Sequence, residues 1–147
     1  MTDNAPSAPD SVFTLIIRGD LPGRFVWRDE RVVAFLTIAP ITAGHVLVVP
    51  VDQVDKWTDL PNDLWLELNA VAIEVGRAIE DAFDCVRVGT IIAGLEVPHC
   101  HLHLLPINAE SDLSFAKANP NVPAEELDAA AEAIRAALRA RGHATPG

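Results

Sequence analysis

The stretch Val97-Pro-His-Cys-His-Leu-His-Leu-Leu-Pro106 contains three of the five histidines in the chain. His99, His101 and His103 occupy alternate positions, and in an extended strand alternate side chains point to the same face. Neighbouring imidazoles would then lie roughly 6–7 Å apart, twice the rise per residue of a strand. Cys100 and the leucines would point the other way, into an apolar layer. Because imidazole titrates near neutral pH, binds metals and acts as a base or nucleophile, the pattern predicts a functional site on one face of a strand.

The composition is typical of one globular domain. The chain has 147 residues, of which 50% are hydrophobic and 22% are charged, so it can form a single core. Residues 1–10 are polar and rich in proline and are expected to form a flexible tail; because they lack a basic start and an apolar block, they do not resemble a signal peptide. No apolar run approaches the roughly 20 residues that span a bilayer, so no membrane partner is expected.

Net charge and cysteine content indicate which binding partners and which cellular location to expect. The formal net charge of −10 opposes binding to a polyphosphate backbone, so no nucleic-acid partner is expected. A few local donors can still hold a small anionic ligand. The two cysteines, Cys85 and Cys100, provide no disulfide framework, and a cytoplasmic location is therefore expected.

The order of apolar periods and turn residues predicts an α+β fold with about five strands in a mainly antiparallel sheet. Ala93-Gly94 is expected to make a tight turn into the histidine strand, and His143 is expected to be inert beyond the last helix. The expected elements are a short helix over 11–18 with Ser11 and Gly19 as caps, strands over 25–28, 32–36, 45–49, 86–92 and 97–106, an amphipathic helix of about 20 residues from Pro61, and a helix over about 123–141.

The histidine stretch resembles the pattern His-φ-His-φ-His-φ-φ, with φ apolar, that gives the histidine triad (HIT) family its name. Four further segments resemble the family in order and spacing: Phe13–Pro22, Val33–Pro40, Ala43–Pro50 and Ala93-Gly94. The likeness is to the Hint-like branch of nucleotide-binding hydrolases. It implies a HIT-like catalytic domain over residues 11–107, followed by an extension over 108–147 that carries the C-terminal helix.

The resemblance also implies a reaction and roles for four histidines. It implies metal-independent hydrolysis or transfer at the α-phosphorus of a nucleotide phosphoramidate or phosphoanhydride, with no cofactor. His101 would be the nucleophile and form a covalent nucleotidyl-histidine, and His103 would contact the phosphate. His99 and His45 would orient the imidazole system, and backbone N–H groups near Gly94 would help to hold phosphate oxygens. A homodimer through the long helix and the central sheet is implied as well.

Positions that line the nucleotide site in relatives are partly kept and partly changed. The apolar positions of the base pocket correspond to Phe13, Ile16, Leu21, Leu36 and Ile38. Four polar positions differ: Thr37 replaces a ribose-binding aspartate, Val88 an asparagine, Leu95 a phosphate-side glutamine, and Glu96 a small hydroxyl residue. Because one hydroxyl cannot replace a carboxylate that accepts two hydrogen bonds, weak or redirected nucleotide specificity is expected. Ser11 and Thr14 stand where some members carry zinc-binding cysteines, so that zinc site is expected to be absent.

Two other functions fit the same residues. A histidine-metal hydrolase would need about three ligands near 2.0–2.1 Å from one ion, but the outer histidines of one straight strand lie roughly 13 Å apart. Only a two-histidine site aided by His45 or Glu96 would serve. The second alternative is a catalytically weak module of the same fold that binds a small phosphorylated ligand. It would bind without forming a covalent adduct.

Overall fold

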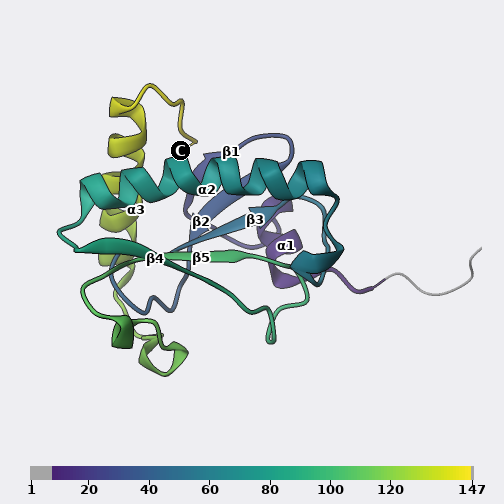
Figure 1. Cartoon of the computed structure of the whole chain (residues 1–147), viewed down its shortest axis with the longest axis horizontal. Coiled ribbons are helices and arrows are strands. Elements are labelled where there is room, and N and C mark those ends of the chain that lie inside the picture. Colours follow the sequence, from purple (N-terminus) through teal and green to yellow (C-terminus); the bar gives the residue numbers. More distant parts are fainter. Residues whose placement is uncertain (1–7, 147) are drawn as a thin grey trace, which may run out of the picture.

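The computed structural model describes residues 8–146, so residues 1–7 of the predicted tail lie outside the described part of the chain. Its five strands form one antiparallel sheet in the order β1-β2-β3-β5-β4. Figure 1 shows this sheet with the helices packed on it. The α+β prediction is confirmed. The strands are β1 (Phe25–Arg28), β2 (Val32–Leu36), β3 (Val46–Pro50), β4 (Arg87–Ile92) and β5 (Leu102–Ile107).

Three α-helices form as the sequence periods predict. Helix α1 (Val12–Arg18) begins at Ser11, whose side chain accepts a hydrogen bond from the Thr14 N–H, and ends at Gly19 in the left-handed region. Helix α2 (Asn62–Ala82) buries apolar residues three and four positions apart, and α3 (Ala124–Ala140) does the same. Figure 1 shows α2 lying along the sheet and α3 crossing it. Three short 3₁₀ turns are η1 (Trp57–Asp59), η2 (Glu110–Asp112) and η3 (Phe115–Lys117).

The sheet separates two apolar clusters of unequal size. The larger cluster lies between the sheet and helices α2 and α3, and includes Leu36 of β2 together with Cys100, Leu102 and Leu104. The smaller cluster lies on the α1 face and includes Phe13 of α1 and Phe35 of β2. Because consecutive strand residues point to opposite faces, one strand contributes to both clusters. The prediction that Cys100 and the leucines face an apolar layer is confirmed.

The predicted histidine strand is too long at its start. Strand β5 begins at Leu102, so only His103 of the three lies in a strand, and the tight turn at Ala93-Gly94 is replaced by a nine-residue loop over 93–101. Two features explain the loop. Pro98 has no N–H to donate to a neighbouring strand, and the Cys100 N–H donates to the Val54 carbonyl at 2.7 Å.

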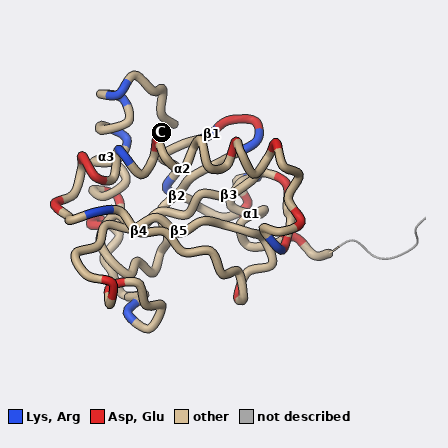
Figure 2. The backbone as a smooth tube through the Cα atoms, viewed as in Figure 1, with Lys and Arg blue, Asp and Glu red and all other residues tan. Residues whose placement is uncertain are grey.

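Charged residues avoid the centre of the molecule. Figure 2 shows them on the helix surfaces and the outer loops, whereas β2, β3 and β5 contain none. No helix within residues 8–146 is long and apolar enough to cross a membrane. His143 lies beyond α3, where its Nε2 is 2.9 Å from a Glu74 carboxylate oxygen and its ring packs on Trp27.

Candidate active site

His45 and His103 form a directly hydrogen-bonded pair. The Ile41 N–H donates to Nδ1 of His45 at 3.0 Å, so in the neutral ring the proton of His45 is on Nε2. That N–H points to Nδ1 of His103 at 2.9 Å. His103 therefore carries its own proton on Nε2, where it can donate to a phosphate oxygen. A residue just before β3 thus sets the tautomer of a ring on β5.

His101 has the tautomer that a nucleophile requires. Its Nδ1 lies 2.8 Å from the backbone carbonyl of His99, and a carbonyl only accepts, so Nδ1 carries the proton. The lone pair is consequently on Nε2. The ring packs edge-on against Phe13, with centroids 4.8 Å apart, and its centroid is also 4.8 Å from that of His103. The Nε2 lone pair of His101 thus lies on a ring next to that of His103, whose Nε2–H is a donor.

His99 is anchored through both of its ring nitrogens. Its Nε2 donates to the Pro50 carbonyl at the end of β3, 2.7 Å away. Its Nδ1 lies 2.7 Å from the Ser11 hydroxyl at the start of α1. Since Nε2 carries the proton, Nδ1 is the acceptor in this second bond. His99 joins α1, β3 and the histidine loop, and it serves the site through its carbonyl.

Burial keeps the four rings neutral at neutral pH. His45, His99 and His101 are only 3%, 0% and 6% exposed. Burial lowers the pKa of His45 to about 4, and the nearby His101 ring adds to the shift. Burial and the two neighbouring rings lower the pKa of His103 to about 3. The pKa values of His99 and His101 are lowered as well, mainly by burial.

Two of the predicted ligand-contacting residues, Phe13 and Thr37, lie beside the histidines, and a third, Ile16, packs on the cluster that contains Phe13. Phe13 contacts both His99 and His101, and Ile16 packs against the same apolar cluster. Thr37 follows β2, and its N–H donates to the His45 carbonyl at 3.3 Å. Its hydroxyl accepts from the Ala39 N–H at 3.1 Å and still has its own proton to donate.

Two predicted residues point to the other face of the sheet. Leu36 belongs to the cluster under α2 and α3, and Val88 of β4 packs against that same cluster. Leu36 also lines the small cavity beside His45, whereas Val88 does not. On β4 it is Ile91 that sits directly across from His103 in the register, and so shares its face.

The remaining predicted residues are solvent-facing or part of the histidine loop. Leu21 is exposed and Ile38 is 73% exposed, while Leu95 is 96% exposed at the tip of the loop beside the exposed Glu96. Gly94 has φ +79°, which a side chain would strain.

The C-terminal extension adds a residue that the sequence did not single out. Phe115 of η3 packs edge-on against His103, with ring centroids 5.0 Å apart, and remains 49% exposed. It is the only aromatic residue after the histidine motif, which is the signal that could have identified it. The extension also holds the loop before His45, because the Asn119 N–H donates to the Pro40 carbonyl at 3.0 Å.

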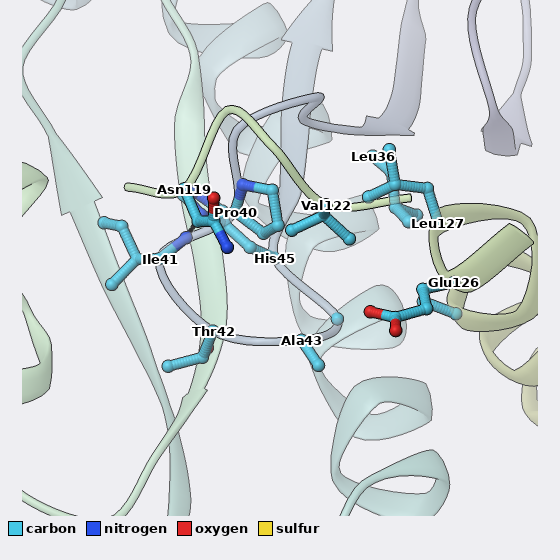
Figure 3. Close-up of a pocket in the computed structure, with 12 residues that line it drawn as sticks. Leu36, Pro40, Ile41, Thr42, Ala43, His45, Asn119, Val122, Glu126 and Leu127 are labelled. Carbon is cyan, nitrogen blue, oxygen red and sulfur yellow. Dashed lines mark hydrogen bonds between the residues drawn. The ribbon is translucent and has the colours of Figure 1, made fainter. Parts of the chain in front are cut away.

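A small cavity of about 170 Å³ lies next to His45, between the 40–44 loop and the extension. Figure 3 shows Val122 and Leu127 of the extension facing Ala43 across it, with the Glu126 carboxylate directed into the space. The lining is mostly apolar. The extension therefore forms one wall of the space beside His45.

Within residues 8–146, no three His, Cys, Asp or Glu side chains come close enough together to hold a metal ion. Ser11 and Thr14, which stand where some relatives carry zinc-binding cysteines, take part in hydrogen bonds. The Thr14 hydroxyl donates to Oε1 of Gln53 at 2.7 Å, and the Ser11 hydroxyl contacts His99.

The fold and site define a class of small antiparallel α+β proteins in which neutral, buried histidines gather at the starts of two adjacent strands, β3 and β5. A sequence profile described as the HIT domain matches residues 18–110, and the chain therefore belongs to the HIT domain family. The "Protein hit" of Bacillus subtilis is 33% identical over 110 residues, which cover 71% of this chain and 76% of that protein. The adenosine 5'-monophosphoramidase HNT1 of Saccharomyces cerevisiae is 29% identical over 106 residues, covering 70% and 67%. The crystal structure of a Hit-like protein from Bartonella henselae has a TM-score of 0.79 at 25% identity, covering 90% of this chain and 99% of that chain.

Proposed function

We propose that this protein hydrolyses nucleotide-like phosphoramidates or phosphoanhydrides through a covalent intermediate on His101. The observation that carries the proposal is the hydrogen bond from Nδ1 of His101 to the His99 carbonyl, which leaves the Nε2 lone pair free to attack phosphorus. The relation to a yeast adenosine 5'-monophosphoramidase supports the same class of substrate. No metal ion is required in this scheme.

The reaction proceeds in two displacements. In the first, the Nε2 lone pair of His101 forms a bond to phosphorus, the bond from phosphorus to the leaving nitrogen breaks, and the nitrogen takes a proton from solvent and leaves as an amine. The ring is then an imidazolium, and the His99 carbonyl at 2.8 Å stabilises its Nδ1–H. In the second, water attacks phosphorus and gives a proton to solvent, the bond to His101 breaks, and a nucleoside monophosphate leaves with the ring neutral again. The Nε2–H of His103 holds a phosphate oxygen in both steps.

The changed contacts favour a substrate that is held less firmly by its ribose. Thr37 can donate one hydrogen bond, whereas the aspartate of relatives accepts two with charge assistance. Leu95 and Glu96 are exposed and supply no phosphate donor from their side chains. We therefore infer that binding energy comes mainly from the phosphate and from apolar contacts near Phe13.

Intact-mass analysis after rapid quench tests the proposal. Adenosine 5'-phosphoramidate and an aryl phosphoramidate of adenosine are mixed with the protein and with the His101→Asn variant. We expect the wild-type protein alone to gain the mass of one nucleotidyl group and to turn over. Binding by calorimetry without adduct or turnover would support the phosphoryl-ligand binding module instead. Activity that is lost with a chelator would support the histidine-metal hydrolase.

We further propose that the protein is a homodimer through α2 and β4. Strand β4 is an edge of the sheet, and α2 exposes Leu66 and Ile73 beside it. A hollow lined by these side chains and Val88 lies between the two elements. Sedimentation equilibrium is expected to give twice the chain mass and to give one chain mass for Ile73→Glu. The exposed Ala136→Glu on α3 is the matched control, and a monomeric wild-type protein would refute the dimer.

A further inference from the structure

We propose that Ser11 is a positioning residue for the nucleophile, acting through His99 to hold the carbonyl that orients His101. This inference rests on the proposed function for its effect on turnover, but its structural content concerns the tautomers of two rings. The Ser11 hydroxyl is 2.7 Å from Nδ1 of His99, and the two residues are 88 positions apart in the chain.

The carbonyl that orients His101 lies in an irregular loop. Residues 93–101 belong to no helix or strand, so no regular ladder fixes the carbonyl of His99. The loop is instead fastened by the His99 ring to Ser11 and Pro50, and by the Cys100 N–H to Val54. Breaking the bond to Ser11 leaves Nδ1 of His99 only the longer contact to the Thr14 hydroxyl, at 3.4 Å.

The direction of the Ser11 hydroxyl is determined by its neighbours. The Thr14 N–H donates to Oγ of Ser11 at 3.0 Å and occupies an acceptor site. The Thr14 hydroxyl donates to Oε1 of Gln53 at 2.7 Å, and the Ser11 N–H donates to the same oxygen at 2.7 Å. The Ser11 proton is therefore directed to the bare Nδ1 of His99. The oxygen of Thr14 is also within reach, but at the longer distance of 3.3 Å.

This arrangement keeps His99 neutral with its proton on Nε2, facing the Pro50 carbonyl. If Nδ1 of His99 became protonated, a positive charge would sit on the ring two residues before His101. Such a charge would oppose the imidazolium that His101 becomes on attacking phosphorus. Ser11 thus serves the site both by anchoring the loop and by fixing the protonation of His99.

The test separates positioning from helix capping. Ser11→Asp keeps a good N-cap for α1, but a carboxylate only accepts, so Nδ1 of His99 has to become protonated. Ser11→Ala removes both the cap and the donor. The exposed Asn62→Asp on α2 adds the same charge without touching a histidine. Circular dichroism and urea unfolding first establish that each variant is folded.

Two-dimensional ¹H–¹⁵N spectra of the histidine rings give the primary readout. We expect wild-type protein and Asn62→Asp to show a neutral His99 with its proton on Nε2 and a His101 with its proton on Nδ1. In Ser11→Asp we expect a doubly protonated His99 and a mixture of His101 tautomers. With adenosine 5'-phosphoramidate, kcat of Ser11→Asp should fall about tenfold or more while KM stays within about twofold, because the loss falls on the reacting ring.

The outcomes are distinct. A single Nδ1–H tautomer of His101 in both folded Ser11 variants would overturn the inference, and so would an unchanged kcat in the presence of a protonated His99. If the wild-type protein has no turnover, the proposed function fails, but the His101 tautomer in the variants still decides the role of Ser11. A tautomer that changes only in Ser11→Ala would support the anchoring role with no contribution from the charge of His99.

Discussion

Nε2 of His45 lies 2.9 Å from Nδ1 of His103, so a residue of the loop before β3 determines which nitrogen of a β5 ring carries a proton. The bond crosses 58 residues of sequence and joins neighbouring strands. It makes the phosphate-facing nitrogen of His103 a donor. The pair therefore works as one unit, although only His103 belongs to the histidine triplet.

Replacing His45 should impair the reaction more than it impairs the fold. His45→Leu fills the buried space but leaves the tautomer of His103 undetermined, so we expect kcat to fall about a hundredfold. Stopped-flow or steady-state assays with adenosine 5'-phosphoramidate measure the change. His143→Leu is the matched control, because His143 contacts Glu74 and Trp27 and no site histidine. Equal losses in both variants would contradict the pairing.

Stability should fall as the pH drops below about 6.5. An unfolded histidine titrates near pH 6.5, whereas burial holds the pKa of His45 at about 4 and that of His103 at about 3. In this window the unfolded chain binds more protons than the folded chain, so acid favours unfolding. We expect a loss of at least about 2 kcal/mol between about pH 6.5 and 4.5.

Urea unfolding at closely spaced pH values measures this dependence. His45→Leu should show a shallower slope than wild type, because one of the neutral buried rings is gone. A stability that is flat across the window would mean that the rings are already charged or exposed in the folded protein.

Gly44 should not accept a side chain. Its φ of +93° disfavours any other residue, and a Cβ there would lie 2.6 Å from Cε2 of Phe83. We expect Gly44→Ala to lower the free energy of unfolding by about 2–3 kcal/mol. Gly142→Ala is the matched control, because it has a φ of +92° but nothing within 4 Å. The difference between the two variants isolates the clash with Phe83, and equal losses would show that only the backbone angle matters.

Phe115 should affect substrate binding more than stability. The ring is half exposed and packs edge-on against His103, a contact worth about 0.5–1.5 kcal/mol. We expect Phe115→Ala to raise KM several-fold for an aryl phosphoramidate of adenosine, with a loss of unfolding free energy no greater than that range. Trp57→Ala, which removes a similarly exposed ring stacked on Trp65, should leave KM unchanged. An unaltered KM in Phe115→Ala would place the extension outside the substrate site.

The periods of apolar residues predicted the elements well, but not which face each strand residue occupies. Every residue of β2 is buried, because the sheet is covered on both sides. The sequence therefore lacks the alternation that would have separated Phe35 from Leu36. Leu36 and Val88 were predicted to contact the ligand from the family resemblance alone, and both side chains lie on the side of the sheet that faces α2 and α3.

The histidine segment shows a different limit. Alternation predicted a strand from Val97, but the strand begins at Leu102 because Cys100 bonds to Val54, a partner that only the folded chain reveals. The contacts of Ser11 with His99 and of Phe115 with His103 span 88 and 12 residues, so the sequence can single out these residues but not the rings that they touch. The sequence predicted which histidines form the site, and the structure adds which ring nitrogen of each one carries the proton.

Cys100 is buried between two histidines and faces the apolar side of the sheet, and burial raises the pKa of its thiol to about 11. A thiol in that state reacts very slowly with alkylating reagents. Its rate of labelling in the native protein therefore measures how often the histidine loop opens to solvent. Cys100 is therefore a built-in probe for opening of the loop that contains His101.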